Sequence, residues 1–565
     1  RLFGQDYPRL DYLIDLKRNQ LPDNVKVSEF YFQSGAALGH PSMQRHYISS
    51  NYTHVARDMV DRGANLILQL VAGPRAGPAG TPQYSLSCNP DVTLDLKSLL
   101  QGRPDHPIMA IGHVHPDLPF MQGDAVVDAS FFDRIIDDDP VQPLFAVPRG
   151  PVSLQDHAVG FHASGLVADG GTLQIGIGSL SDALVHSLIV RQRENPTYQS
   201  IAAALDRSDA EVRRETEPFS TGLYGASEMF MDGFMHLYRA GILKREVFDD
   251  LALMQRANAG EVLAERGQGA VMDGGFFLGS QPFYDFLNGL DAHEQPRFRM
   301  HGVGRINQLY GGHEALEIEQ RRHARFINTC MMMTATGAAV SDGLSDYQMV
   351  SGVGGQYNFV AMAQAMNDGR SALMLRSVRS HRGQLRPNIV WQYPHNTIPR
   401  HLRDWVVTEY GVANLRGKSD QECIQAMLSI CDAAHQDALM DQAKSAGKLD
   451  PRWQLPSAWR HNTAAGLAAR LQPFIDAGHF PEYPFGSDFT DTEQQLIGAL
   501  GAVKTMATNR FSLIRSALLG RPSDHPRAMR RMGLDAPATI KERVFARVLA
   551  AALAAHSLAE TVDQA

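Results

Sequence analysis

The sequence is poor in cysteine. Its 565 residues include only four, Cys88, Cys330, Cys423 and Cys431, and none of them forms a C-x-x-C pair. Four scattered cysteines cannot build a disulfide scaffold, and without paired thiolates a structural zinc site is not expected. The cysteine content therefore fits the reducing conditions of the cytoplasm, which is the location that we expect.

Basic residues and long apolar runs are also scarce. Lys and Arg total 53 against 61 Asp and Glu, a net charge of −8, which argues against a general nucleic-acid binder. The most apolar late stretch, residues 544–558, contains Arg547 and His556 and is too short to span a bilayer, so no membrane partner is expected. The chain begins at Arg1 with no signal region, and we expect that part of the native N-terminus precedes it.

The residues that are present suffice for a sizeable core, since 44% are hydrophobic and 20% are charged. The first two hundred residues alternate apolar runs typical of strands (25–32, 65–71, 107–111 and 172–177) with helical patterns. The helical patterns are residues 55–62 and 181–191, the second with Ser181 as the expected N-cap. This alternation predicts an α/β domain with a largely parallel sheet.

The rest of the chain divides into three parts. Residues 191–217 are polar and predict an insertion or linker, after which strand patterns at 326–333, 372–375 and 405–408 and a helix at 421–429 continue the α/β rhythm. Helical patterns at 464–475, 492–506 and 540–556 then predict a helical extension. We therefore expect an α/β domain at 1–207, a second α/β domain at 208–440 and a helical extension at 441–565.

The segment 222–240, GLYGASEMFMDGFMHLYRA, contains a candidate nucleophile. Its pattern predicts that Glu228 lies in the first turn of a helix that ends near Gly241. Free N–H groups and the positive dipole end there favour an ionised carboxylate, which can attack an activated acyl group. The alternative is that Ser227 and Glu228 do no more than cap a helix.

Two glycine-rich segments are candidates for ligand binding. Residues 350–359, VSGVGGQYNF, place Gly352, Gly354 and Gly355 where backbone N–H groups could face an oxyanion or a phosphate, although a plain glycine turn is equally consistent. Residues 168–180 run from a strand through Gly176 and Gly178 into a helix, and ligands bind outside the carboxyl ends of such strands.

Three further patterns have ordinary explanations. His113 and His115 have H-x-H spacing, but without further metal ligands a turn before Pro116 is the better interpretation. Residues 331–333 are three methionines, which predict core or a pocket wall. The arginines at 376, 379, 382 and 386 could face phosphates or form a solvated loop.

Taken together, the motifs resemble the acetyl-CoA hydrolase/transferase family, a branch of the class I CoA-transferases. Four segments match the family's elements in its order: ADGGTLQIGIGSLSDAL, GASEMFMDGFMHLYRAGIL, FINTCMMMTATGAAVSD with the following VSGVGGQYNF, and VVTEYGVANLRGKS. The matches are spread over most of residues 25–440. The resemblance implies two open α/β domains of the CoA-transferase type with the active site between them, here followed by the C-terminal helical extension.

The resemblance also implies roles for individual residues. Glu228 matches the nucleophilic glutamate, which would form a mixed anhydride with the acyl group and then a glutamyl-CoA thioester. The backbone at Ile177 and Gly355 matches the positions that donate to the tetrahedral oxyanions. The positions expected near CoA are Gly176, Gly178, Ser179, Leu180, Asn328, Ser351, Gly352, Gly354 and Gln356, together with Arg379 where the family has a lysine.

The sequence departs from the family in ways that bear on the acyl group. Asn358 replaces the usual aspartate after the Gly-Gly-Gln, and Met331 to Thr334 replace an acidic stretch. We therefore expect a CoA-transferase that moves CoA between an acyl-CoA and a small carboxylate, with no separate cofactor, no metal and a homodimeric assembly. An acyl-CoA hydrolase that uses the same glutamate, and a non-catalytic acyl-CoA-binding protein, are the alternatives.

Overall fold

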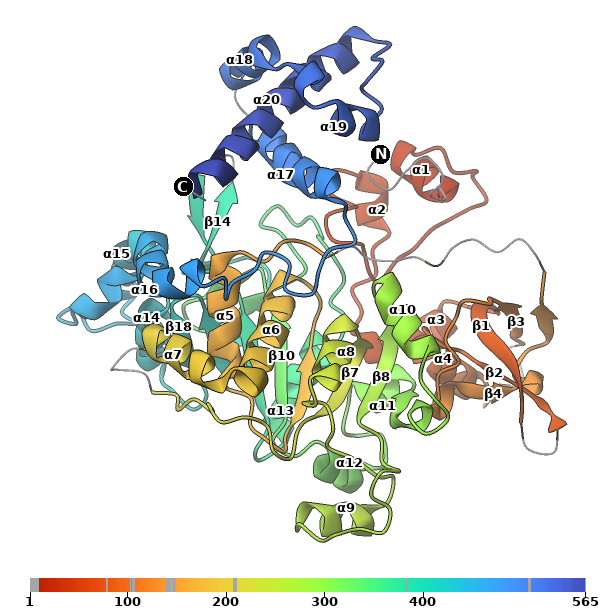
Figure 1. Cartoon of the computed structure of the whole chain (residues 1–565). Coiled ribbons are helices and arrows are strands. Elements are labelled where there is room, and N and C mark those ends of the chain that lie inside the picture. Colours follow the sequence, from red (N-terminus) through yellow and green to blue (C-terminus); the bar gives the residue numbers. More distant parts are fainter. Residues whose placement is uncertain are drawn as a thin grey trace. The chain divides into compact units, whose positions relative to one another are not determined.

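The computed structural model describes residues 10–563 except 78–79, 102, 104–106, 139–143, 145–148, 207–210, 382–383 and 507–509. The chain forms two compact units. The larger is Tyr12–Val378 with Pro387–Phe485, and the smaller contains Arg379–Arg386 and the residues from Gly486 onward, together with the start of the chain. Figure 1 shows the elements of both units.

The first sheet of the larger unit has five strands in the order β4-β2-β1-β3-β5. Their bounds are β1 (Leu66–Ala76), β2 (Pro82–Ser85), β3 (Met109–Val114), β4 (Val126–Asp128) and β5 (Arg134–Ile136). The helices α3 (Val55–Asp61) and α4 (Asp91–Gln101) pack against each other beside it. The strands predicted at 65–71 and 107–111 and the helix predicted at 55–62 are confirmed.

The strand predicted at 25–32 is wrong. These residues make only an isolated bridge from Glu29 to Tyr47, and half of them are exposed. The apolar alternation of VKVSEFYF suits a strand, but a strand also needs a neighbour that completes its hydrogen-bond ladder. Its aromatic residues instead pack in a loop, where Phe30 stacks on Tyr52 with ring centroids 5.7 Å apart.

The second sheet has eight strands in the order β18-β17-β13-β10-β6-β7-β8-β9, and only the edge strand β18 is antiparallel to its neighbour. The bounds are β6 (Thr172–Ile175), β7 (Tyr224–Phe230), β8 (Met272–Phe277), β9 (Phe298–Met300), β10 (Arg325–Thr329), β13 (Arg370–Met374), β17 (Trp405–Thr408) and β18 (Gly411–Asn414). Because the other seven strands run the same way, their carboxyl ends lie along one edge of the sheet.

Helices cover this sheet, and α5 (Leu154–Ser164), α6 (Ser179–Arg193) and α8 (Asp232–Arg239) lie in front of it in Figure 1. The N-cap of α6 is Gly178, and Ser181 lies inside the helix, so the predicted cap is wrong. Gly178 has a φ of +114°, which glycine alone adopts readily, and α6 begins three residues earlier than it would with Ser181 as its N-cap.

The polar stretch at 191–217 is not simply a linker. Its first part completes α6 and forms α7 (Asn195–Leu205), whose Tyr198 and Ile201 are fully buried. The predicted domain boundary at residue 207 lies outside the described residues. The larger sheet takes β6 from before that boundary and β7 from after it, and the division into domains at 207 stays a prediction.

The C-terminal helices divide between the two units. α14 (Asp420–Ser429), α15 (Ala433–Ser445) and α16 (Ala464–Asp476) belong to the larger unit. α17 (Asp491–Met506), α18 (Arg510–Leu519), α19 (Pro526–Arg531) and α20 (Ile540–Asp563) belong to the smaller one, where Leu496, Met529 and Leu549 form part of a separate buried core. The helices predicted at 464–475, 492–506 and 540–556 are therefore confirmed.

The remaining elements are α1 (Asp11–Arg18), α2 (Pro41–Arg45), α9 (Leu251–Asn258), α10 (Gln281–Asn288), α11 (Val303–Ile306), α12 (Glu314–Gln320), α13 (Gln356–Ala365), β11 (Met332–Thr334), β12 (Ala339–Val340), β14 (Val378–His381), β15 (Gln384–Pro387) and β16 (Ile389–Val390). The predicted class, α/β with two open sheets and helices at the C-terminus, is confirmed. Within the described ranges, no helix combines the length and the apolar character needed to cross a membrane.

Candidate active site

Glu228 lies on a strand and not in a helix, which corrects the sequence-based expectation. It is near the carboxyl end of β7, between Ser227 and Met229, which pair with Gly274 and Phe276 of β8. Helix α8 begins only at Asp232, although its end at Arg239 fits the prediction. The ladder with β6 and β8 fixes these residues as a strand, and a helical pattern that is read from one segment alone cannot reveal that pairing.

The carboxylate of Glu228 is held by an amide and a glycine. Asn307 Nδ2 donates a hydrogen bond to Glu228 Oε2, with 2.5 Å between the two atoms. A Cβ placed on Gly355 would lie 1.7 Å from the same oxygen, so no other residue fits there. Gly355 has a φ of −95°, and the requirement for glycine is therefore one of space and not of backbone angle. The structure thus brings Glu228 and the glycine loop together.

The start of helix α13 faces Glu228. Gly355 is its N-cap, and Gln356 Nε2 donates to the backbone oxygen of Thr329 at 2.7 Å, which ties the helix start to the end of β10. A helix N-terminus carries partial positive charge and free N–H groups, which favour an anion beside it. We expected Glu228 to lie at the N-terminus of its own helix. The helix N-terminus that lies beside its carboxylate is instead that of α13.

Burial among protein atoms raises the pKa of Glu228 to about 7. The hydrogen bond from Asn307 opposes this rise, and the nearby carboxyl group of Asp91 adds to it. Burial likewise raises the pKa of Asp91 to about 6, against a lowering by the hydrogen bond that Tyr52 donates to it. Glu228 is thus ionised at neutral pH only in part, and its anion is poorly solvated and correspondingly reactive.

The loop between β6 and α6 presents open backbone near the same edge. A Cβ on Gly176 or Gly178 would meet nothing within 4 Å, and 46% of the Ile177 side chain is exposed. Ser227 Oγ donates to the backbone oxygen of Ile175 at 3.2 Å, which joins the end of β6 to the strand of Glu228. Ser179 and Leu180 form the first turn of α6. The loop leaves room for a ligand beside the strand of Glu228.

Other predicted residues have partners of their own. Asn328 on β10 is buried and exchanges two hydrogen bonds, of 3.2 and 3.1 Å, with Gln174 on β6. Ser351 Oγ donates to the backbone oxygen of Gly352, and a Cβ on Gly352 would collide with Tyr31 and Phe30. The roles predicted for these residues toward CoA stay predictions.

Arg379 lies on β14, within the smaller unit, whereas Glu228 belongs to the larger one. Of the other arginines in the predicted cluster, Arg376 pairs with the buried Asp156 at 2.6 Å, and Arg382 lies outside the described residues. Met332 and Met333 are buried on β11, as expected for core. The chain turns at Pro116, as the H-x-H segment predicted.

Sequence reasoning missed Asn307, Asp91 and Tyr52. Asn307 follows the short helix α11, and GRINQLYGG contains no motif that marks it. Asp91 follows Asn89 and Pro90 at the start of α4, a pattern that resembles ordinary helix initiation. Each of these residues reaches the site through the tertiary fold, so no local spacing could have identified it.

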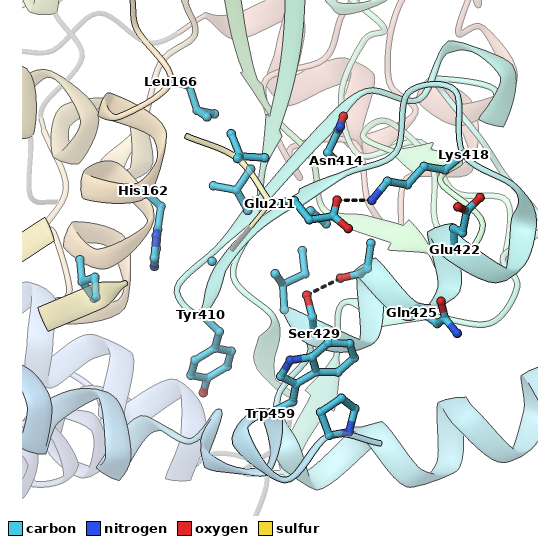
Figure 2. A pocket seen from close by; sticks show the side chains of 18 of the residues that line it. His162, Leu166, Glu211, Tyr410, Asn414, Lys418, Glu422, Gln425, Ser429 and Trp459 are labelled. Carbon is cyan, nitrogen blue, oxygen red and sulfur yellow. Dashed lines mark hydrogen bonds and ion pairs between the residues drawn. The ribbon is translucent and has the colours of Figure 1, made fainter. Parts of the chain in front are cut away.

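A cavity of about 350 Å³ lies elsewhere in the larger unit, along the edge strand β18. Figure 2 shows His162 and Leu166 on one side, Glu422 and Gln425 on the other, and an ion pair between Lys418 and Glu211. None of the predicted site residues lines it. In the described part of the chain, no group of three His, Cys, Asp or Glu side chains is placed to hold a metal ion.

Comparisons with known proteins agree with this arrangement. The profile of the acetyl-CoA hydrolase/transferase C-terminal domain matches residues 279–443. The 4-hydroxybutyrate coenzyme A transferase of Clostridium kluyveri is 24% identical over 338 residues, which cover 60% of this chain and 65% of that enzyme, just under two thirds of its length. The succinyl-CoA:cyclohexane-1-carboxylate CoA transferase of Geobacter metallireducens is 22% identical over 67% of this chain and 71% of its own length.

Solved structures share the fold. The crystal structure of RipA from Yersinia pestis has a TM-score of 0.53 at 23% identity and covers 71% of this chain and 76% of its own. The 4-hydroxybutyrate CoA-transferase of Porphyromonas gingivalis has a TM-score of 0.50 at 22% identity and covers 74% and 84%. The two α/β sheets thus have the CoA-transferase fold. Residues 279–443 are thus similar to the C-terminal domain of the acetyl-CoA hydrolase/transferase family, and the related sequences are those of CoA transferases.

Proposed function

We propose that the protein is a CoA-transferase that moves CoA from an acyl-CoA to a small carboxylate through a glutamyl-CoA thioester on Glu228. The observation that carries the proposal is the carboxylate itself. It is partly buried at the carboxyl end of a strand, its pKa is raised to about 7, and an amide and a glycine loop hold it. A desolvated carboxylate that is not neutralised by an ion pair is suited to nucleophilic attack.

The chemistry has two halves. Glu228 attacks the acyl thioester, CoA thiolate leaves, and a mixed anhydride forms; the thiolate then attacks the glutamyl carbonyl and releases the first carboxylic acid as its anion. The second carboxylate collects CoA by the reverse steps. Each attack places negative charge on a carbonyl oxygen, and the backbone N–H groups of Ile177 and Gly355 are the proposed donors to it.

The proposed CoA contacts are the loop Gly176 to Leu180, the loop Ser351 to Gln356, and Asn328. The open space around Gly176 and Gly178 supports the first of these. Arg379 is retained as a proposed CoA contact on the resemblance alone. CoA is substrate, no separate cofactor or metal takes part, and a homodimer in the cytoplasm is the proposed assembly and location.

Aliphatic and alicyclic carboxylates are the proposed acceptor class. The related enzymes are named for 4-hydroxybutyrate and for cyclohexane-1-carboxylate. The side chain of Tyr31 lies beside Gly352, and the ring of the preceding residue, Phe30, stacks on Tyr52, so that apolar surface lies close to the glycine loop. This surface supports an acyl group larger than acetyl.

The deciding experiment replaces the nucleophile. Glu228→Gln keeps the size and the hydrogen-bonding ability of the side chain but removes the negative charge, and we expect turnover to fall by more than about a thousandfold. CoA exchange between acyl-CoAs and carboxylates measures the activity, and mass analysis of the borohydride-reduced enzyme locates the thioester. Activity that survives in Glu228→Gln, or an adduct on another residue, contradicts the proposal.

Hydrolysis by the same glutamate is distinguished by the acceptor. A transferase releases free thiol slowly from acyl-CoA alone and exchanges CoA once a carboxylate is added, whereas a hydrolase releases thiol without any acceptor. A non-catalytic binder retains acyl-CoA affinity in both the wild type and Glu228→Gln, and neither form turns over.

A further inference from the structure

The cavity along the edge strand β18 takes no part in the proposed reaction. Its volume of about 350 Å³ lies in the range of small-molecule sites in proteins, roughly 300–1,000 Å³. Its walls come from α5, α7, residues 211–214, β18, α14 and residues 453–459, all within the larger unit. Neither Glu228 nor any residue named above as its neighbour lines this cavity. A molecule bound here would therefore be a ligand separate from the acyl-CoA at Glu228.

The edge strand presents backbone groups to this cavity. β18 is antiparallel to β17, and just past its end the N–H of Leu415 donates to the oxygen of Asp404 at 2.9 Å. Because hydrogen-bonded pairs alternate along an antiparallel ladder, the backbone groups of Val412 and Asn414 point away from β17. Both residues line the cavity, and no residue in the described ranges forms a hydrogen bond with their backbone groups. The C=O of Val412 and the N–H of Asn414 thus form a neighbouring acceptor and donor in the cavity wall.

Aromatic rings lie at one end of the cavity. Trp453 and Trp459 pack together with ring centroids 6.0 Å apart, and both are only partly buried. Tyr410 lines the cavity with them. In Figure 2, Tyr410 and Trp459 lie at the bottom of the cavity, whereas Asn414 and Lys418 lie at the top. Planar heterocycles stack on indole and phenol rings, so this end suits a flat ring beside the strand.

Arg214 and Lys418 bring positive charge to the cavity. The Arg214 side chain is 11% exposed, its Nε pairs with Asp206 at 2.6 Å, and its Nη2 donates to His162 Nδ1 at 2.7 Å. Its Nη1 is buried and has no hydrogen-bond partner in the part of the chain that the structure describes. Burial lowers the pKa of the Arg214 guanidinium against the opposing effect of Asp206, so a second anion beside it would be stabilised. Lys418 pairs with the exposed Glu211, whose place an anionic ligand could take.

We propose that this cavity binds a purine nucleoside monophosphate. The Watson–Crick edge of the base hydrogen-bonds to the C=O of Val412 and the N–H of Asn414, and its face lies against Trp459. The phosphate is received by Lys418 and Arg214. Adenine places an N–H donor beside a ring-nitrogen acceptor, and guanine places a carbonyl acceptor beside an N–H donor, so either purine satisfies the strand. This inference does not depend on the proposed function.

A peptide that adds a strand to β18 fits the cavity less well. It would find only the two outward-facing residues Val412 and Asn414, whereas strands in proteins are usually about 5–6 residues long. It would also leave the cationic wall without an anion. Purine and phosphate occur together both in free nucleotides and at the nucleotide end of CoA, and the titrations below separate these two sources.

Direct titration tests this site without any measurement of turnover. AMP, GMP and CoA are each added to the full chain, and calorimetry records the number of molecules bound per chain. We expect one molecule of AMP or GMP per chain, with a change in tryptophan fluorescence. A second CoA per chain, in place of AMP and GMP, would identify the nucleotide end of CoA as the ligand and also supports the inference. No saturation by AMP or GMP at millimolar concentrations, together with a single CoA per chain or none, overturns it.

Substitutions in the cavity locate the binding. Ala426→Phe fills the cavity from α14, and we expect it to abolish the binding of AMP and GMP, or of the second CoA. Ala438→Phe, at an exposed position of α15 outside the cavity, is the matched control and should retain wild-type affinity. Lys418→Gln removes a charge and should weaken the binding of AMP by about tenfold, but not that of adenosine. Nucleotide binding that survives in Ala426→Phe overturns the inference, and should that variant not fold, an unchanged affinity of Lys418→Gln for AMP does so.

Discussion

Gly355 shows how strongly one residue of the site is determined by its neighbour. The oxygen Oε2 of Glu228 occupies the place where any other residue would carry its Cβ. This contact could not be predicted from VSGVGGQYNF, which indicates a tight turn but not the partner that requires it.

We expect Gly355→Ala to lower kcat/KM by on the order of 10²-fold, because the methyl group displaces the carboxylate from its position for attack. The chain retains a good N-cap geometry at that residue, since its φ is negative, so thermal unfolding should change little. Gly150→Ala is the control, since Gly150 is exposed and its Cβ would meet no atom within 4 Å. Equal rates for the two variants would contradict the close contact.

The raised pKa of Glu228 sets the pH dependence of the reaction. The carboxylate attacks only when ionised, so we expect kcat/KM to rise with pH through about 7 and then to level off. Asp91→Asn removes a nearby negative charge that raises this pKa, and the rising limb should move to lower pH. Initial rates across a pH series measure both. In the control Asp285→Asn, whose side chain is exposed, the rising limb of the pH profile should stay in place. An equally unchanged limb in Asp91→Asn would contradict the effect of Asp91 on the pKa of Glu228.

At the scale of elements, β6, β10, β13 and β17 of the parallel sheet were predictable from their apolar runs, whereas β8, β9 and the strand of Glu228 were not. Residues 405–408 are all β-branched or apolar, residues 172–175 are so except for Gln174, and β17 and β6 lie there. The β7 segment, YGASEMF, is followed directly by an amphipathic helix, and its pattern merges with that of α8. Only the pairing with β6 and β8 separates strand from helix here.

Arg191 is the residue that joins α6 to the polar stretch after it. Its side chain is buried and donates to the backbone oxygens of Glu217, Ser164 and Val167, at 2.7, 3.2 and 2.7 Å. Its guanidinium carbon lies 4.3 Å from the ring centroid of Phe219. A stretch that resembles a solvated linker in the sequence is therefore anchored by a buried cation.

We expect Arg191→Ala to lower the free energy of unfolding by about 3–5 kcal/mol, because it leaves two buried carbonyl groups and that of Glu217 without their donor and opens a void. Arg193→Ala, which truncates an exposed arginine on the same helix, should change it by less than about 0.5 kcal/mol. Denaturant titrations compare them. A loss of stability as small as that of the control would show that the buried hydrogen bonds contribute little.

At the scale of the whole molecule, the α/β class and the C-terminal helices followed from the sequence, because each rests on periodicity along one segment. The contacts among Glu228, Asn307 and Gly355 join three separate segments of the chain, and no local pattern encodes them. The family resemblance identified the glutamate and the glycine loop, whereas the amide required the structure.

Buried histidines determine how the fold responds to acid. Burial lowers the pKa of His186 to about 4, with further lowering by His157 and His479, and burial lowers the pKa of His236 to about 4, with further lowering by Arg149. An unfolded histidine titrates near ~6.5. The unfolded chain therefore binds protons that the folded chain rejects, and stability is lost as the pH falls from about 6.5 toward 4.

The expected result is a thermal unfolding midpoint that decreases between pH 7 and 5. His186→Gln should flatten part of this decrease, since it removes one of the groups that titrates only on unfolding. His401→Gln, an exposed position, should retain the full slope. If the unfolding midpoint falls equally steeply with decreasing pH in both variants, proton binding by His186 is not linked to folding.

The close fit of Gly355 and Asn307 to one oxygen also decides where solvent can enter. Because protein atoms fill that side of the carboxyl group, we expect water to approach its carbon from the other side, which is the side proposed to receive CoA. CoA bound on that side would block the approach of water for as long as it stays bound. Bound CoA would then protect the proposed glutamyl thioester from hydrolysis, without the need for a dedicated lid.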